Sequence, residues 1–240
     1  MKRIKSVALS GAMIFSLFCH NIWAANAQSW NLARDMYLMT EKSPAGSPWA
    51  FMQNKTAVNA AANYTLFPTL HADQCGDGAT TCWMEGAGNG YIAIVKKSWT
   101  FSGSGSSSLF KQGDVVAHPG SNFQSIVRWT SPIAGNINVL GRINDLHNAC
   151  GDGISWSLNL GDTLLQSGSL AKGGSSLIHV DNIAVTVAAA LYLVIDKKAN
   201  YSCDATSFDP LRKLRTRCPS AGNRRLEDAE KPDFQPLIIG

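Results

Sequence analysis

Residues 125–140 read SIVRWTSPIAGNINVL, and the alternation of apolar and polar side chains in this stretch is typical of β-strands. Residues 125–130 form one expected strand, which Pro132 ends. After Gly135, residues 136–140 alternate asparagine with branched apolar residues and form a second expected strand. We expect these two strands to pair as a hairpin.

Other stretches show the same preference for strands. Residues 154–165 (ISWSLNLGDTLL) alternate apolar residues with serine and carry a Gly-Asp turn, which predicts a hairpin. Residues 183–195 are almost wholly apolar and rich in β-branched residues, which favours two buried strands over a helix. Residues 102–108 are mainly glycine and serine and predict a flexible loop. Since about eight to ten strands fit residues 28–211, the predicted fold class is all-β: one antiparallel two-sheet sandwich, or jelly roll.

The composition excludes several classes of protein. Apolar residues make up 45% of the chain and charged residues only 16%, which argues against disorder for most of it. No apolar run is long enough to predict a membrane span. Residues 28–211 hold 11 Lys or Arg against 13 Asp or Glu. Because nucleic acid requires a basic surface for its phosphates, this near-neutral body excludes it as a partner.

The two ends of the chain differ from this body. Residues 1–27 have a basic start, an apolar stretch and a small-residue ending at Ala25-Asn26-Ala27, which is the pattern of a cleaved secretory signal peptide. We therefore expect an exported protein, either secreted, periplasmic or at the cell surface. Residues 212–240 are basic, contain prolines and lack periodicity, so they are expected to be a disordered tail.

Five cysteines follow the expected signal peptide, in a compartment where disulfides persist. Counting alone does not give their connectivity, but local context favours Cys75 with Cys82 across one Gly/Asp/Thr loop, and Cys150 with Cys203 between two polar turns. A zinc site is disfavoured because no two cysteines have the close spacing of metal ligands. Cys218 is then left over, and it could link two chains into a disulfide-bonded dimer.

Six short motifs occur along the expected β-domain. They are residues 30–35 (WNLARD), 44–49 (PAGSPW), 118–120 (HPG), 127–132 (VRWTSP), 151–153 (GDG) and 201–210 (YSCDATSFDP). In this order they resemble the jelly-roll modules of the galactose-binding-like, carbohydrate-binding-module type found in bacterial secreted and surface proteins. The resemblance covers residues 29–211 and implies a β-sandwich that binds extracellular glycan. Ala189-Ala190 departs from it, because such modules usually place a Gly-Asp turn there.

Modules of this type hold a structural calcium ion where the first strand meets the last. The resemblance therefore implies Asp35, near the start, and Asp209, near the end, as calcium ligands, because a hard cation needs oxygen donors and negative charge. In the alternative interpretation, Asp35 pairs with an arginine or caps a turn.

A sugar site needs an exposed aromatic face with polar groups beside it. Trp83 follows Cys82 in a Gly-rich region and is our first candidate for this platform, and Trp49 is the second. Asp152, Asn200 and Asp204 are the candidate polar partners if the Cys150–Cys203 bridge gathers their loops. Burial of both tryptophans is the alternative that remains open, whereas Trp129 and Trp156 are expected in the core.

The sequence favours a secreted module that binds carbohydrate or glycoconjugate without turnover. The first alternative is a structural or adhesive cell-surface protein without sugar specificity. A carbohydrate-active hydrolase is less expected, because no arrangement in the sequence supplies a nucleophile, a base and oxyanion donors together.

Overall fold

The computed structural model describes residues 28–56, 58–76, 78–86, 90–103, 105–209 and 238–239. The expected signal peptide (residues 1–27), residue 218 and most of the expected tail lie outside these described residues. No helix within the described ranges is long and apolar enough to cross a membrane.

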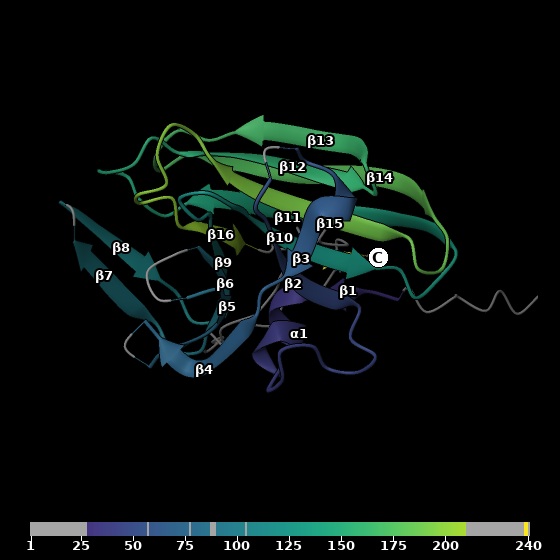
Figure 1. Ribbon diagram of the computed structural model, residues 1–240, viewed down its shortest axis with the longest axis horizontal. Helices are drawn as coiled ribbons and strands as arrows, with labels where there is room; N and C mark the ends of the chain where they lie inside the picture. The colour runs from purple at the N-terminus through teal and green to yellow at the C-terminus, as the bar shows by residue number, and fades with distance from the viewer. Residues whose placement is uncertain are drawn as a thin grey trace, which may run out of the picture.

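Two antiparallel sheets form the body of the domain (Figure 1), which confirms the predicted two-sheet sandwich. The larger sheet has the order β1 (Trp30–Asn31), β17 (Ile238–Ile239), β11 (Gly135–Asp145), β16 (Thr206–Asp209), β9 (Val115–His118), β6 (Tyr91–Val95), β5 (Thr80–Met84) and β4 (Thr69–Cys75), and β14 (Ser175–Val185) also pairs with β11. The smaller sheet has the order β13 (Thr163–Ser169), β12 (Ile154–Leu160), β15 (Ala190–Lys197), β10 (Gln124–Thr130), β2 (Trp49–Asn54) and β3 (Tyr64–Leu66).

Three smaller elements complete the chain. Helix α1 (Leu32–Tyr37) follows β1, and its first turn is capped by the Asn31 side chain, which accepts a hydrogen bond from the Arg34 N–H at 2.8 Å. A short 3₁₀ turn spans Ala61–Asn63. Strands β7 (Trp99–Gly103) and β8 (Ser106–Phe110) pair only with each other, as a hairpin beside β4 (Figure 1). The Gly/Ser-rich stretch expected as a flexible loop is therefore largely strand, which corrects that expectation.

The main core lies between the two sheets because alternate residues of each strand point inward. Trp83 and Ile92 from the larger sheet pack with Phe51, Trp129 and Trp156 from the smaller one. Trp129 is 1% exposed and Trp156 is 4% exposed, so the expected core role of both is confirmed.

The hairpin expected from residues 125–140 does not form. The first strand, β10, lies in the smaller sheet, whereas the second, β11, lies in the larger one. The segment that connects β10 to β11 passes from the smaller sheet to the larger one, beside the segment that connects β14 to β15. There the Ser131 N–H donates to the Ala189 carbonyl at 2.7 Å. Crossing lets the apolar residues of both strands enter the core between the sheets, β10 from the smaller sheet and β11 from the larger one.

The other strand predictions fit the structure. Strands β12 and β13 form the expected hairpin, with Leu160 opposite Thr163 across the Gly-Asp turn. The apolar stretch 183–195 supplies the end of β14 and most of β15 as two strands.

Within the segment expected as a tail, Ile238–Ile239 pair with both β1 and β11, and Ile239 is buried.

Both favoured disulfides are present. Cys75 and Cys82, with Cα atoms 6.3 Å apart, close the loop between β4 and β5. Cys150 and Cys203, with Cα atoms 5.7 Å apart, join the loop after β11 to the loop before β16.

Candidate binding cleft

The outer face of the larger sheet carries the candidate site. Along β5, β6 and β9, Trp83, Ile92 and Ala117 point into the core, so their neighbours in sequence point outward. The outward set includes Cys82, Met84, Tyr91, Ala93, Val116 and His118, and all of these line one cleft.

The β7–β8 hairpin turns this sheet face into a cleft of about 490 Å³. Trp99, Phe101 and Phe110 of the hairpin form its opposite wall, and His71 and Gln74 of β4 lie at its edge. Phe110 is buried against Val95 and Val116 of the sheet, which fixes the base of the hairpin through a small apolar cluster of its own.

Aromatic rings dominate the lining. The rings of Trp99 and Phe110 stack with their centroids 4.4 Å apart, and those of Tyr91 and His118 stack at 5.5 Å. Trp99, Phe101 and Tyr91 keep part of their surface exposed. Partly exposed aromatic surface therefore lines the cleft, and aromatic surface is a feature of carbohydrate recognition.

The indole of Trp99 is held in place from two sides. Its Nε1 donates to the Thr80 hydroxyl oxygen at 3.1 Å. The ring also lies over the Cys75–Cys82 loop, where a Cβ added to Gly76 would be only 2.5 Å from Trp99 Cε2. Gly76 has a φ of +54°, so it both supplies the turn and leaves room for the ring.

His118 provides a polar atom within this aromatic site. Its Nδ1 lies 2.7 Å from the Pro119 carbonyl oxygen, which can only accept, so Nδ1 carries the proton and Nε2 is a hydrogen-bond acceptor in the neutral ring. Burial lowers the pKa of His118 to about 4, against an opposing effect of the Pro119 hydrogen bond. The imidazole is therefore neutral at pH 7.

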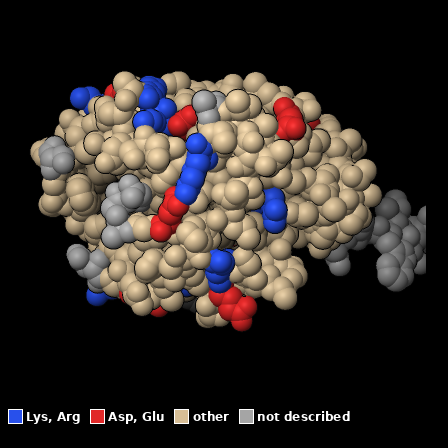
Figure 2. All heavy atoms as spheres, viewed as in Figure 1, with Lys and Arg blue, Asp and Glu red and all other residues tan. Residues whose placement is uncertain are grey.

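The described residues that line the cleft are uncharged or aromatic, apart from two histidines. Among the described residues that line it, none is Lys, Arg, Asp or Glu. The molecular face shown in Figure 2 likewise carries few charged side chains. A neutral ligand with apolar and hydroxyl surfaces fits such a lining better than an anion does.

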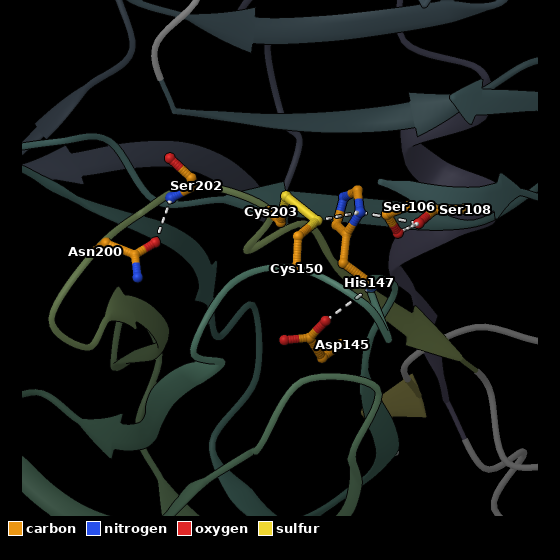
Figure 3. The surroundings of a disulfide bond; sticks show 8 residues. All are labelled: Ser106, Ser108, Asp145, His147, Cys150, Asn200, Ser202 and Cys203. Carbon is orange, nitrogen blue, oxygen red and sulfur yellow. Dashed lines mark hydrogen bonds between the residues drawn. A yellow bond between two sulfur atoms is a disulfide. The ribbon is translucent and has the colours of Figure 1, made fainter. Parts of the chain in front are cut away.

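A buried serine–histidine contact lies close to the hairpin. Ser108 Oγ is 2.9 Å from His147 Nδ1, and the same nitrogen is 3.9 Å from Cys150 Sγ of the disulfide (Figure 3). Asp145 accepts from the main-chain N–H of His147 rather than from its ring, so it does not orient the imidazole as a triad carboxylate would. Ser108 is 2% exposed, and this contact is therefore structural.

The two tryptophans expected as sugar platforms are both buried. Trp83 is 0% exposed and donates from Nε1 to the Lys42 carbonyl at 2.9 Å. Trp49 is 4% exposed and donates to Asp35 Oδ2 at 2.9 Å. The expectation of an exposed platform at either position is wrong, because both side chains point from their strands into the inter-sheet core.

The expected polar partners do gather at the Cys150–Cys203 bridge, but not as a sugar-binding surface. Asp152 Oδ2 accepts from the main-chain N–H groups of Ala199 and Asn200, at 2.9 and 3.3 Å. Asn200 is exposed and accepts from the Ser202 N–H at 3.0 Å. Asp204 is fully buried, so a surface ligand does not reach it.

Asp35, which the resemblance implies as a calcium ligand, is held by donors from its own surroundings. Its Oδ1 accepts from the Arg34 guanidinium at 2.8 and 3.0 Å, and its Oδ2 accepts from Trp49. Donors from a cation and an indole thus occupy the carboxylate, as in the alternative interpretation of Asp35. The side chain of Asp209 lies outside the described part of the structure.

The sequence did not predict Gln74, Tyr91, Trp99 or Phe101 as residues of the cleft. One sequence signal for the hairpin wall was available. Trp99-Thr100-Phe101 alternates aromatic and polar residues directly before a Gly/Ser-rich turn, which is the pattern of a hairpin with one aromatic face.

Comparisons with known proteins give structural neighbours only. No family model and no curated protein matches the chain. One similar solved structure is CBM51 from Clostridium perfringens GH95 in complex with methyl-galactose, with 13% identity and a TM-score of 0.37 over 75% of this chain and 96% of that chain. Another is TmCBM61 in complex with β-1,4-galactotriose, with 12% identity and a TM-score of 0.26 over 59% of this chain and 84% of that chain. The ligand of this chain has to be argued from its own residues, because these scores are low.

Proposed function

We propose that this protein is an exported module that binds a neutral carbohydrate in the cleft between the β7–β8 hairpin and the larger sheet, without chemical turnover. The observation that carries the proposal is the set of partly exposed aromatic rings, led by Trp99 and Tyr91, that face one uncharged cleft. A sugar ring offers a C–H face for such rings and hydroxyl groups for the polar atoms beside them.

Size and hydrogen bonding agree with this ligand class. The cleft volume of about 490 Å³ falls within the usual range for small-ligand pockets. Gln74 at the edge both donates and accepts, and Nε2 of neutral His118 accepts from a hydroxyl. The motif resemblance to carbohydrate-binding modules supports the same class independently of the cleft.

A glycan array of neutral oligosaccharides, followed by calorimetry on the best ligand, tests this proposal. We expect Trp99→Ala to weaken binding at least about tenfold, which corresponds to roughly 1.4 kcal/mol of lost contact energy. Gln74→Ala, an exposed change with little reason to affect folding, should also weaken it. Leu164→Ala, an exposed apolar change on β13, serves as the matched control and should bind normally.

Three results would contradict the proposal. If Trp99→Ala binds carbohydrate with the affinity of the wild type, the binding site lies elsewhere on the molecule. A flat array combined with adhesion to cells would favour the structural or adhesive alternative. Release of product from a tested polysaccharide would favour a hydrolase.

A further inference from the structure

A histidine and two cysteines come together where the loop after β11 meets the loop before β16 (Figure 3). His147 Nδ1 lies 3.9 Å from Cys150 Sγ, and one ligand atom from each of His147, Cys150 and Cys203 lies within 4.8 Å of the other two. Imidazole nitrogen and thiolate sulfur are the donors that zinc and similar ions prefer. Because the two sulfurs are joined to each other in the disulfide, they become metal ligands only after reduction.

The fold supplies the ligand spacing that the cysteines lack in the sequence. Two residues separate His147 from Cys150, which is the short spacing of a local ligand pair in zinc sites, and Cys203 joins this pair from a sequence separation of 53. The bond lengths of tetrahedral zinc place a sulfur and a nitrogen ligand about 3.5 Å apart and two sulfur ligands about 3.8 Å apart. The observed nitrogen–sulfur distance of 3.9 Å is already close to the first value. After reduction, side-chain rotation has only to separate the two sulfurs.

The imidazole is held in place by contacts other than the disulfide. The main-chain N–H of His147 donates to Asp145 Oδ1 at 2.8 Å, and the ring meets that of Phe101 edge to face at a centroid distance of 5.5 Å. Ser108 Oγ lies 2.9 Å from Nδ1. A metal ion at Nδ1 would replace this last contact, and the Ser108 hydroxyl can turn instead to Ser106 Oγ, which lies 3.4 Å away.

The two loops are also joined by hydrogen bonds that reduction does not break. The Leu146 N–H donates to the carbonyl of Ala205 at 2.8 Å, and the Ala199 N–H donates to Asp152 Oδ2 at 2.9 Å. We therefore expect the two thiols to stay side by side in the reduced protein. Both cysteines of the bridge are partly exposed, so a reductant and a metal ion reach them from solvent.

We propose that His147, Cys150 and Cys203 bind a divalent metal ion of the zinc class when the disulfide between the two cysteines is reduced. A dithiol gives its two electrons and two protons to the disulfide, which yields two protein thiols and the cyclic disulfide of the reductant. Metal binding then releases both thiol protons and forms two metal–sulfur bonds and one bond to His147 Nδ1. Water takes the fourth position, because the cysteine side of the site is open to solvent.

The disulfide and the metal ion are thus alternative states of one site. An oxidising compartment favours the disulfide, and reducing conditions favour the metal-bound form. This site does not depend on the proposed carbohydrate function, and it uses none of the residues that the motif resemblance implies as calcium ligands.

Cobalt titration of the reduced protein tests the inference, since Co²⁺ is a coloured substitute for Zn²⁺. The probe is the chain from residue 28 to residue 240 with Cys218→Ser, which removes the cysteine outside both bridges. It is reduced with dithiothreitol, freed of the reductant without oxygen and titrated with CoCl₂. We expect one Co²⁺ per reduced chain with the near-ultraviolet charge-transfer absorption of thiolate ligands. The oxidised chain should lack this absorption, and Zn²⁺ should displace the cobalt.

Two ligand variants separate the sulfurs from the imidazole. Cys203→Ser should lower the charge-transfer absorption, because it removes one thiolate. His147→Gln keeps both thiols and should weaken cobalt binding at least about tenfold. If His147→Gln fails to fold, Cys203→Ser and the comparison of the reduced with the oxidised chain decide the matter, because Cys203 is partly exposed.

Two control variants leave the proposed ligands intact. His179→Gln removes an exposed histidine that pairs with Asp181, and it should bind cobalt like the reference chain. The double change Cys75→Ser with Cys82→Ser removes the other disulfide and should also retain one bound Co²⁺.

Three outcomes would overturn the inference. A reduced chain without thiolate absorption, whether folded or unfolded by circular dichroism, would show that the two loops do not present the ligands together. An unchanged cobalt affinity in folded His147→Gln would exclude the imidazole. Loss of binding in the double change at Cys75 and Cys82 would place the ion there. Glycan binding is scored separately on the oxidised protein with Trp99→Ala, so either proposal can fail while the other stands.

Discussion

Acid should destabilise the protein through His118, one of the rings of the cleft. This imidazole stacks on Tyr91, meets the edge of the Tyr201 ring at a centroid distance of 6.3 Å and donates from Nδ1 to the Pro119 carbonyl. Burial, with a smaller contribution from His147, lowers its pKa to about 4. The folded protein therefore keeps the ring neutral over a pH range in which the unfolded chain protonates it.

The sign and size of the effect follow from proton linkage. Between pH 6.5 and pH 4 the unfolded state binds a proton at His118 that the folded state does not bind, so the free energy of unfolding falls as the pH falls. The difference between 6.5 and about 4, about 2.5 pKa units, corresponds to roughly 3 kcal/mol lost by pH 4. Asp204 and Asp145, whose pKa values burial raises, act in the opposite direction over the same range. The contribution of His118 to the pH dependence is therefore measured by comparing the wild type with a variant that lacks this histidine.

Urea unfolding at pH 7.5 and pH 4.5 gives this comparison. In the wild type, the stability difference between the two pH values should exceed that of His118→Asn by about 2 kcal/mol. The variant keeps a donor near the Pro119 carbonyl but does not titrate. His118→Leu, which also loses the hydrogen bond, should be less stable at pH 7.5 yet show the same reduced pH dependence. Equal pH dependence in wild type and both variants would refute the assignment of a buried neutral imidazole.

The remaining predictions concern the fold and the wall of the cleft. Replacing both cysteines of the Cys150–Cys203 bridge, which closes a sequence separation of 53, should lower the free energy of unfolding by about 4 kcal/mol in urea, and a loss below about 1 kcal/mol would contradict the chain-entropy account. Trp83→Ala should cost about 3–5 kcal/mol in the same assay while the folded fraction binds carbohydrate normally, so a selective loss of binding would count against its core position. Gly76→Ala should weaken carbohydrate binding in calorimetry because it displaces the Trp99 ring. Gly78→Ala is the control, since Gly78 also has a positive φ but no such clash, and it should leave binding intact. Equal effects of the two changes would show that backbone strain alone is responsible.

The sequence predicted the fold class well because strand periodicity is a local property. Alternation over residues 125–130 and 154–165 survives in β10, β12 and β13. Pairing between strands is not local, so the expected hairpin of β10 with β11 was wrong even though both strands exist. Both favoured disulfides are present because local sequence marks their loops: Cys75 and Cys82 flank one Gly/Asp/Thr turn between β4 and β5, and Cys150 and Cys203 lie in two polar loops that the fold brings together.

The cleft shows why its aromatic residues were harder to predict than the core. The alternation in β5 predicts that Cys82 and Trp83 face opposite sides of the sheet, but it does not predict which of these sides the second sheet covers. A tryptophan is compatible with either face, and in β5 the larger ring takes the inter-sheet core while the cysteine takes the outer face and its disulfide. That outer face becomes a site only because the β7–β8 hairpin folds over it. The position of Trp99 therefore depends on tertiary packing of the hairpin, which no local pattern of residues specifies.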